Sequence, residues 1–321
     1  MQVGGQRGQR GQRALRRLGE RRRTRGLDPG LVHGIVAAAS SQPAMTASDP
    51  ESQYNNRLRI PEYRDIIARW QAVSAVERPT ARADLDQPYG PEDRQRYDLF
   101  HAAEPGAPLI VYIHGGYWQL GGRQDTAFIA RALTGAGIAV AVPSYSLCPA
   151  VSVMQIIDEL RRCLAALWAA TGKHPIVVGH SAGGHLVAAM LATDWRRVPG
   201  VPPDLVRAGC AISGVFELAP LIATTMNRAL RLDAETAAAV SPVSWPPPPP
   251  GRTLVTAVGA DETAEFHRQS RAITERWAQA GLVTEYLAID GVHHFTIVDE
   301  LTRPASALFA RVAALAHGRS P

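Results

Sequence analysis

The sequence is poor in cysteine and lacks a long hydrophobic run. Its 321 residues include three cysteines, with neither a Cys-x-x-Cys pair nor histidines at zinc-ligand spacing. That pattern argues against structural disulfides and gives no reason to expect a metal site. No stretch approaches the eighteen or so apolar residues that cross a bilayer. We therefore expect a cytoplasmic protein without disulfides, without metal and without a membrane-spanning segment.

Excess positive charge is absent from the body of the chain, although the formal net charge is +5. Residues 1–44 hold nine arginines against two acidic residues, a net +7, so the remaining residues carry +5 less +7, or −2. A near-neutral body lacks the clustered Lys and Arg that bind nucleic-acid phosphates. We expect residues 1–49 to form a disordered basic extension, with an RNA- or membrane-binding arm as the alternative. Met45 is a candidate start of the native chain.

From residue 108 onward, short β-branched runs alternate with longer stretches that carry apolar residues at helical spacing. The alternation indicates parallel strands joined by helical crossovers. The predicted strands are 108–114, 138–143, 175–179, 207–213, 253–259 and 283–290. The predicted helices are 153–170, 184–192 and 266–280. Near-continuous apolar strands are typical of a sheet that is covered by helices on both faces.

Further segments flank or interrupt this alternation. Residues 85–89 and 94–101 indicate an antiparallel hairpin, and residues 60–76 indicate a helix that precedes it. Residues 216–251 break the alternation and end in five consecutive prolines, which can neither continue a helix nor join a central strand. We expect a small lid insertion followed by a stiff linker.

A Gly-x-Ser-x-Gly motif, Gly179-His180-Ser181-Ala182-Gly183, lies between a predicted strand and a predicted helix. In that context the motif forms a strained turn that presents the serine as a nucleophile at the carboxyl edge of the sheet. The following helix directs its first N–H groups at the same point. The context is that of α/β-hydrolases, and it predicts a mostly parallel central sheet with helices on both faces and a small lid insertion.

A second motif, His-Gly-Gly-Tyr-Trp at residues 114–118, ends the first strong strand. Gly115 and Gly116 leave room for backbone N–H groups to approach a reacting carbonyl. The N–H groups of this turn, up to Tyr117, and the N–H of Ala182 would then form an oxyanion hole. We therefore predict that both motifs belong to one site.

The two motifs together resemble the kynurenine formamidase (arylformamidase) group of α/β-hydrolases, whose oxyanion motif is His-Gly-Gly-x-Trp. Similar stretches occur at residues 54–57, 145–149, 192–195 and 265–270, so the resemblance spans about residues 50–315. Lipases and esterases of the hormone-sensitive type more often carry a third glycine at the position of Tyr117. The resemblance implies a catalytic domain over residues 50–317.

In this fold the catalytic residues follow the order serine, acid, histidine along the chain. The base follows the last strand, where His293 and His294 are adjacent, and the formamidase pattern of His before Phe selects His294. The acid should follow strand 253–259, where Asp261 and Glu262 compete. Alignment with the family favours Glu262, and a general preference for Asp favours Asp261. We choose Glu262, and the role of His293 stays open.

The resemblance implies an N-formyl arylamine substrate, with N-formyl-L-kynurenine as the type case. Ser181 would form an acyl-enzyme, and no cofactor is needed. Tyr117 and Trp118 are expected to flank the aromatic leaving group. A carboxylesterase for small acyl esters, using the same residues, is the alternative. We expect a small-molecule substrate, no nucleic acid bound by the folded domain and no membrane partner, and a homodimer stays open.

Overall fold

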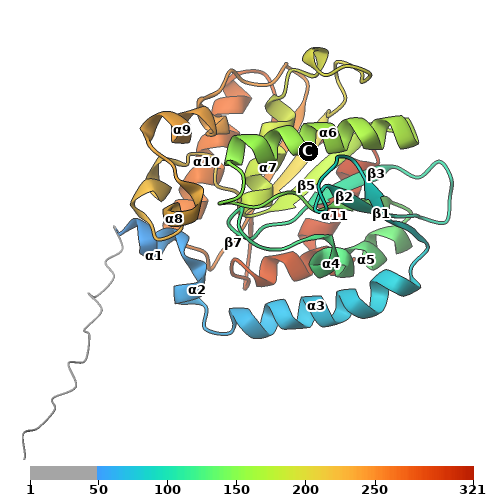
Figure 1. Ribbon diagram of the computed structural model, residues 1–321, viewed down its shortest axis with the longest axis horizontal. Helices are drawn as coiled ribbons and strands as arrows, with labels where there is room; N and C mark the ends of the chain where they lie inside the picture. The colour runs from blue at the N-terminus through green and yellow to red at the C-terminus, as the bar shows by residue number, and fades with distance from the viewer. Residues whose placement is uncertain (1–48) are drawn as a thin grey trace, which may run out of the picture. The chain divides into compact units, whose positions relative to one another are not determined.

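The computed structural model describes residues 49–321, whose centre is one eight-stranded sheet (Figure 1). The strands are β1 (Ala83–Pro88), β2 (Arg96–Phe100), β3 (Leu109–Ile113), β4 (Ala139–Pro143), β5 (Pro175–His180), β6 (Ala208–Ile212), β7 (Thr253–Gly259) and β8 (Val283–Ile289). Their spatial order is β1-β2-β4-β3-β5-β6-β7-β8. β2 pairs antiparallel with β1 and β4, and the other neighbours pair in parallel. The predicted hairpin and the mostly parallel sheet are confirmed.

The central strands are buried on both faces. Along β3, Leu109, Val111 and Ile113 belong to one hydrophobic cluster, and Ile110 and Tyr112 belong to a second. Successive side chains of a strand point to opposite faces of the sheet. Every position of such a strand must therefore be apolar, which explains the continuous hydrophobic runs in the sequence.

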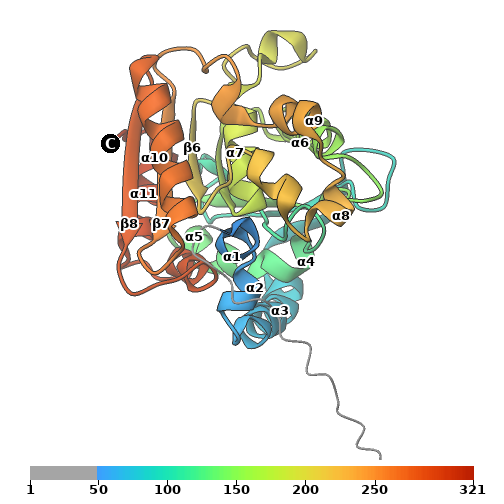
Figure 2. The ribbon, with the colours of Figure 1, turned by 90° about the vertical axis from the view of Figure 1, so that its left-hand side faces the viewer.

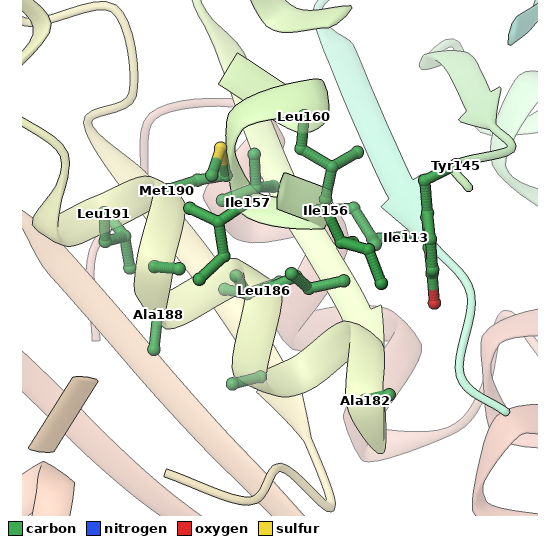
Figure 3. Packing of buried hydrophobic residues seen from close by; sticks show 14 of the residues in the cluster. Ile113, Tyr145, Ile156, Ile157, Leu160, Ala182, Leu186, Ala188, Met190 and Leu191 are labelled. Atoms are coloured by element: carbon green, nitrogen blue, oxygen red, sulfur yellow. The ribbon is translucent and has the colours of Figure 1, made fainter. Parts of the chain in front are cut away.

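Three helices cover one face of the sheet (Figure 1). They are α6 (Val153–Thr171), α7 (Ala182–Ala192) and α10 (Ala264–Gln279). Figure 3 shows Ile157 of α6 directed toward α7, which presents Leu186, and all of these side chains belong to one cluster. Every residue of α7 except the last is buried, so the helix that follows Ser181 is enclosed by the core.

The opposite face is covered by segments from both ends of the folded part (Figure 1). They are α3 (Tyr63–Thr80), α4 (Arg123–Thr126), η1 (Ala127–Ile129), α5 (Ala130–Gly135), η5 (Thr296–Thr302) and α11 (Ala307–Ala316). Trp70 of α3 stacks on Phe128 with ring centroids 5.4 Å apart, and lies 6.5 Å from the ring of Phe295. These aromatic contacts join α3 to the loop that follows β8.

The predicted lid insertion, residues 216–251, folds into short helical segments. They are η3 (Ala219–Ala223), α8 (Asn227–Leu230), α9 (Ala234–Ala239) and η4 (Pro242–Ser244). Leu221, Leu230 and Val240 are buried in the same cluster as α6 and α7, and Figures 1 and 2 show α8 and α9 on that side of the sheet. The insertion therefore packs against the body of the protein. The remaining segments are α1 (Pro50–Tyr54), α2 (Asn56–Arg59) and η2 (Trp195–Arg197).

Some helix bounds differ from the predicted ones. α3 begins at Tyr63 rather than residue 60, because Ile60 precedes Pro61 and a residue before proline avoids the helical conformation. It also continues to Thr80, four residues past the predicted end at residue 76. α4, α5 and α11 were not predicted, because their short apolar patterns do not stand out from the neighbouring loops.

Residues 1–48, which include Met45 and nearly all of the predicted basic extension, lie outside the described residues. Within residues 49–321, no helix is long and apolar enough to cross a membrane. The three cysteines are buried and unpaired. Burial raises the pKa of Cys148 to about 11, which keeps this loop thiol protonated at neutral pH.

Candidate active site

The predicted site residues converge at the carboxyl ends of four parallel strands. The turn with Gly115 follows β3, Ser181 follows β5, Glu262 follows β7 and His294 follows β8. A cavity of about 260 Å³ opens at this edge, and Gly115, Tyr117, Ser181 and His294 are among its lining residues. In an open α/β sheet this edge is the usual ligand site. The fold thus brings to one place residues that lie almost 180 positions apart.

Ser181 occupies a strained turn between β5 and α7. Its φ of 57° and ψ of −117° lie in a region that residues with a side chain rarely adopt. Gly179 and Gly183 make the turn possible, since a Cβ on Gly183 would lie 2.0 Å from the carbonyl oxygen of Ile113 and one on Gly179 would lie 2.5 Å from the oxygen of Gly183. Larger residues at either position would force the strand and helix apart.

The turn after β3 leaves backbone donors free beside the serine. A Cβ on Gly115 would lie 3.1 Å from the Cβ of Ser181, so the two turns are in contact. Gly116 has a φ of 110° and Tyr117 a φ of 56°. Within residues 49–321, the N–H groups of Gly116, Tyr117 and Ala182 donate no hydrogen bond to the protein. Free N–H groups at a helix N-terminus and an adjacent turn suit a developing negative charge.

Glu262 is the acid that contacts His294. The distance from His294 Nδ1 to Glu262 Oε2 is 2.7 Å, and the Glu262 side chain is fully buried. Its other oxygen, Oε1, accepts hydrogen bonds from Ser213 Oγ at 2.5 Å and from the N–H of Gly259 at 2.8 Å. Because a carboxylate only accepts, Nδ1 of His294 carries a proton, which leaves Nε2 free to act as a base.

Asp261, the competing acid, is exposed. Asp261 neither caps the next helix nor lies in its first turn. Thr263 is the N-cap residue of α10 and Asp261 lies two residues before it, because the loop after β7 turns once more before the helix begins.

The two adjacent histidines face different partners. His294 is 2% exposed and lines the cavity with Ser181, whereas His293 Nε2 lies 3.4 Å from Glu62 Oε1. The Nδ1 atom of His293 accepts a hydrogen bond from the N–H of Phe295.

No hydrogen bond joins Ser181 Oγ to His294 in the described part of the chain. In serine hydrolases this contact often tightens only when substrate binds.

His180 binds the backbone of the residue that serves as the base. Its Nε2 donates a hydrogen bond to the carbonyl oxygen of His294 at 2.7 Å, and the two rings lie 4.6 Å apart. Burial, with a smaller contribution from the imidazole of His294, keeps the pKa of His180 well below its usual value. His180 is therefore neutral, and it fixes the position of His294 without competing for its proton.

Trp118 lies in the core beside the site. Its side chain is 2% exposed and its Nε1 donates a hydrogen bond to Nδ1 of His185 at 3.3 Å. The Nε2 of His185 in turn donates to the carbonyl of Val240, which ties the oxyanion turn to the lid insertion. Tyr117 lines the larger cavity, whereas Trp118, which we expected to flank the leaving group as well, does not. Both border a second, narrow cavity of about 10 Å³ that touches Ser181.

Ser213 was missed by the sequence analysis. It follows β6, has a φ of 50° and donates a hydrogen bond to Glu262. No motif marks it, and its only signal is its place at the end of a strand next to β5 and β7.

Within residues 49–321, no group of three or more His, Cys, Asp or Glu side chains could hold a metal ion.

A family model described as the alpha/beta hydrolase fold matches residues 110–297. A kynurenine formamidase of Danio rerio is 28% identical over 275 residues, covering 80% of this chain and 92% of the relative. A kynurenine formamidase of Drosophila melanogaster is 29% identical over 225 residues, covering 66% and 74%. Among solved structures, a protein of Silicibacter sp. tm1040 described as a candidate thioesterase is 32% identical, covers 81% of this chain and 97% of its own, and has a TM-score of 0.73.

These comparisons confirm the resemblance to the kynurenine formamidase group and the predicted fold. Every predicted site residue, from Gly115 to His294, lies inside the matched region. The site described above therefore belongs to the part of the chain that matches the family model.

Proposed function

The chain belongs to the α/β-hydrolase fold family and is a hydrolase, and we propose that it cleaves N-formyl arylamines to formate and the free arylamine. N-formyl-L-kynurenine is the type case, because relatives from fish and fly are kynurenine formamidases. Ser181, His294 and Glu262 form the catalytic triad of this proposal. Residues 50–317 form the catalytic domain.

In the proposed reaction, Ser181 Oγ attacks the formyl carbon while Nε2 of His294 takes the hydroxyl proton. Glu262 holds the imidazole in the required tautomer through its contact with Nδ1. The N–H groups of Gly116, Tyr117 and Ala182 stabilise the oxyanion. His294 then gives its proton to the leaving nitrogen, the C–N bond breaks, and the arylamine departs. Water attacks the formyl-serine by the same route and releases formate.

The narrow cavity beside Ser181 carries the proposal for a formyl group. Its volume is about 10 Å³, and apolar side chains such as Leu221, Met226 and Phe266 line it. A volume of that size holds roughly one water-sized probe. The hydrogen of a formyl group fits such a space easily, a methyl group is somewhat larger than the probe, and a propyl group requires these side chains to move. The larger cavity, of about 260 Å³, has room for the aromatic leaving group.

A series of formyl, acetyl and butyryl amides of one arylamine tests this assignment. Each added methylene should lower kcat/KM by roughly 10- to 200-fold, since each must crowd the side chains that line the narrow cavity. A flat or rising series, or ester hydrolysis that exceeds formamide hydrolysis, would identify a carboxylesterase for small acyl esters instead.

Two neighbouring substitutions sharpen the test. Leu221 lines the narrow cavity and is 2% exposed, whereas Ile222 is 36% exposed. Leu221→Ala should raise the rate on the acetyl amide relative to the formyl amide. Ile222→Ala, which removes the side chain of the next residue on the surface, should leave that ratio unchanged.

The cytoplasmic location stays a prediction, as do the small-molecule substrate and the homodimer. We further propose that the folded domain acts without nucleic acid and without a membrane partner, because the charge of the chain is concentrated outside the described residues.

A further inference from the structure

Arg57 is a cationic side chain in the wall of the larger cavity, which also includes Ser181. It lies on α2, and its guanidinium carbon is 4.9 Å from the ring centroid of Tyr117 and 5.8 Å from that of Tyr63. Its Nε atom is buried without a hydrogen-bond partner. Within residues 49–321, no carboxylate forms an ion pair with it.

Other arginines near this edge are paired. Arg69 of α3 contacts Asp299 at 2.7 Å, and Arg268 of α10 contacts Glu265 at 2.9 Å. A buried guanidinium nitrogen without an acceptor is costly, because water cannot replace the missing hydrogen bond. Tyr117 cannot serve as the anion, since burial raises its pKa to about 12 and it stays neutral. Arg57 thus lacks an acceptor within residues 49–321, and a ligand in the cavity can supply one.

The backbone that carries Arg57 is held in place. Tyr54 of α1 donates a hydrogen bond to Glu265 at 2.5 Å, and the Oγ1 of Thr263 donates to the carbonyl of Gln53 at 2.8 Å. Both contacts are with residues that closely follow Glu262 in the chain. Figure 2 shows the short α1 and α2 segments lying between α10 and α3. The backbone that leads to Arg57 is thus anchored beside the loop that carries the triad acid.

We propose that Arg57 binds a carboxylate carried by the leaving group of the substrate, so that the enzyme selects aryl formamides that bear a carboxylate. This inference rests on the proposed function. A planar guanidinium recognises a carboxylate with two parallel hydrogen bonds. The ring of Tyr117, which lines the same cavity, stabilises the guanidinium through a cation–π contact. Asp125 lines the same cavity and, being acidic, repels a carboxylate toward Arg57.

Binding measured without turnover tests the inference separately from the proposed function. In a Ser181→Ala background, calorimetry should give a Kd for N-formylkynurenine roughly 10- to 100-fold lower than for its carboxamide, the range of a charge-assisted hydrogen bond. Adding Arg57→Met should bring the two Kd values close together, and Arg57→Lys should retain part of the difference. Arg64→Met is the matched control, because Arg64 lies 5.7 Å from the same Tyr63 ring but is exposed and outside the cavity wall.

Equal Kd values for the acid and the amide in the Ser181→Ala protein would overturn the inference, as would a preference that survives Arg57→Met or no binding of either ligand. The proposed function is judged independently, from the turnover of N-formylkynurenine by the unmodified enzyme. If the carboxylate preference depends on Arg57 but the unmodified enzyme does not turn over N-formylkynurenine, the carboxylate site at Arg57 is supported and the proposed formamidase activity is refuted.

Discussion

Replacing Glu262 by glutamine tests the hydrogen bond that joins the acid to the base. Glutamine has nearly the same shape, and its side-chain oxygen can still accept from Ser213 and from the N–H of Gly259. Its amide nitrogen then faces Nδ1 of His294, where the carboxylate oxygen lay at 2.7 Å. An amide N–H is a donor, so His294 must turn Nδ1 into an acceptor and place its proton on Nε2. Nε2 can then no longer accept the proton of Ser181.

The expected cost of this tautomer change is large. In serine proteases the same replacement of the triad carboxylate lowers kcat by about 10⁴-fold. At about 1.36 kcal/mol for each factor of ten, this corresponds to about 5.4 kcal/mol of transition-state stabilisation. Asp261 is exposed and lies outside this network. Asp261→Asn should therefore leave kcat close to the wild-type value, because the acid that contacts His294 is Glu262.

Steady-state hydrolysis of N-formylkynurenine by the two variants, with a circular-dichroism melt to confirm folding, gives the comparison. The background rate comes from the Ser181→Ala protein. A Glu262→Gln variant that is folded and retains near-normal kcat would refute the role of the carboxylate. A large loss in Asp261→Asn with little loss in Glu262→Gln would transfer that role to Asp261.

Three further predictions concern the serine and the histidines. Ser181→Ala should lower kcat by about 10⁶-fold with an unchanged melting temperature, and residual activity near the normal level would remove it from the mechanism. His294→Ala should be as damaging and His293→Ala much milder, because His293 pairs with Glu62; equal kcat losses would contradict this choice. Burial lowers the pKa of His114 and of His185 from 6.5 to about 4. As pH falls, these two histidines are therefore protonated in the unfolded chain at a higher pH than in the folded protein. Urea titrations should show the free energy of unfolding falling as pH drops from 6.5 toward 4, by about 2 kcal/mol per histidine at pH 5, and a constant value over that window would contradict it.

The parts of the site that the sequence predicted are those encoded by short continuous segments. The turn at Ser181 is fixed by its two glycines and by the strand and helix on either side, so its position can be read from local residues. Continuous apolar runs likewise marked the buried strands. His294 required the family pattern, because two adjacent histidines have the same local sequence context although only one lines the cavity.

Other contacts depend on packing between distant segments and have no local signature. Ser213 meets Glu262 because β6 and β7 are neighbours in the sheet, 49 residues apart in the chain. Arg57 reaches the cavity because α1 is anchored to α10, through residues more than 200 positions away. The sequence also could not separate Asp261 from Glu262 by residue type, since only the backbone path after β7 decides which side chain turns inward.

Locating the covalent bond formed with phenylmethylsulfonyl fluoride most directly tests whether Ser181 is the nucleophile of this hydrolase. The protein is inactivated to increasing extents, digested and analysed by mass spectrometry, with residual formamidase activity measured on the same samples. We predict one sulfonyl group per chain, on the peptide that contains Ser181, in proportion to the activity lost. Inactivation with the label on another residue, or full activity with Ser181 completely labelled, would contradict the assignment of Ser181 as nucleophile.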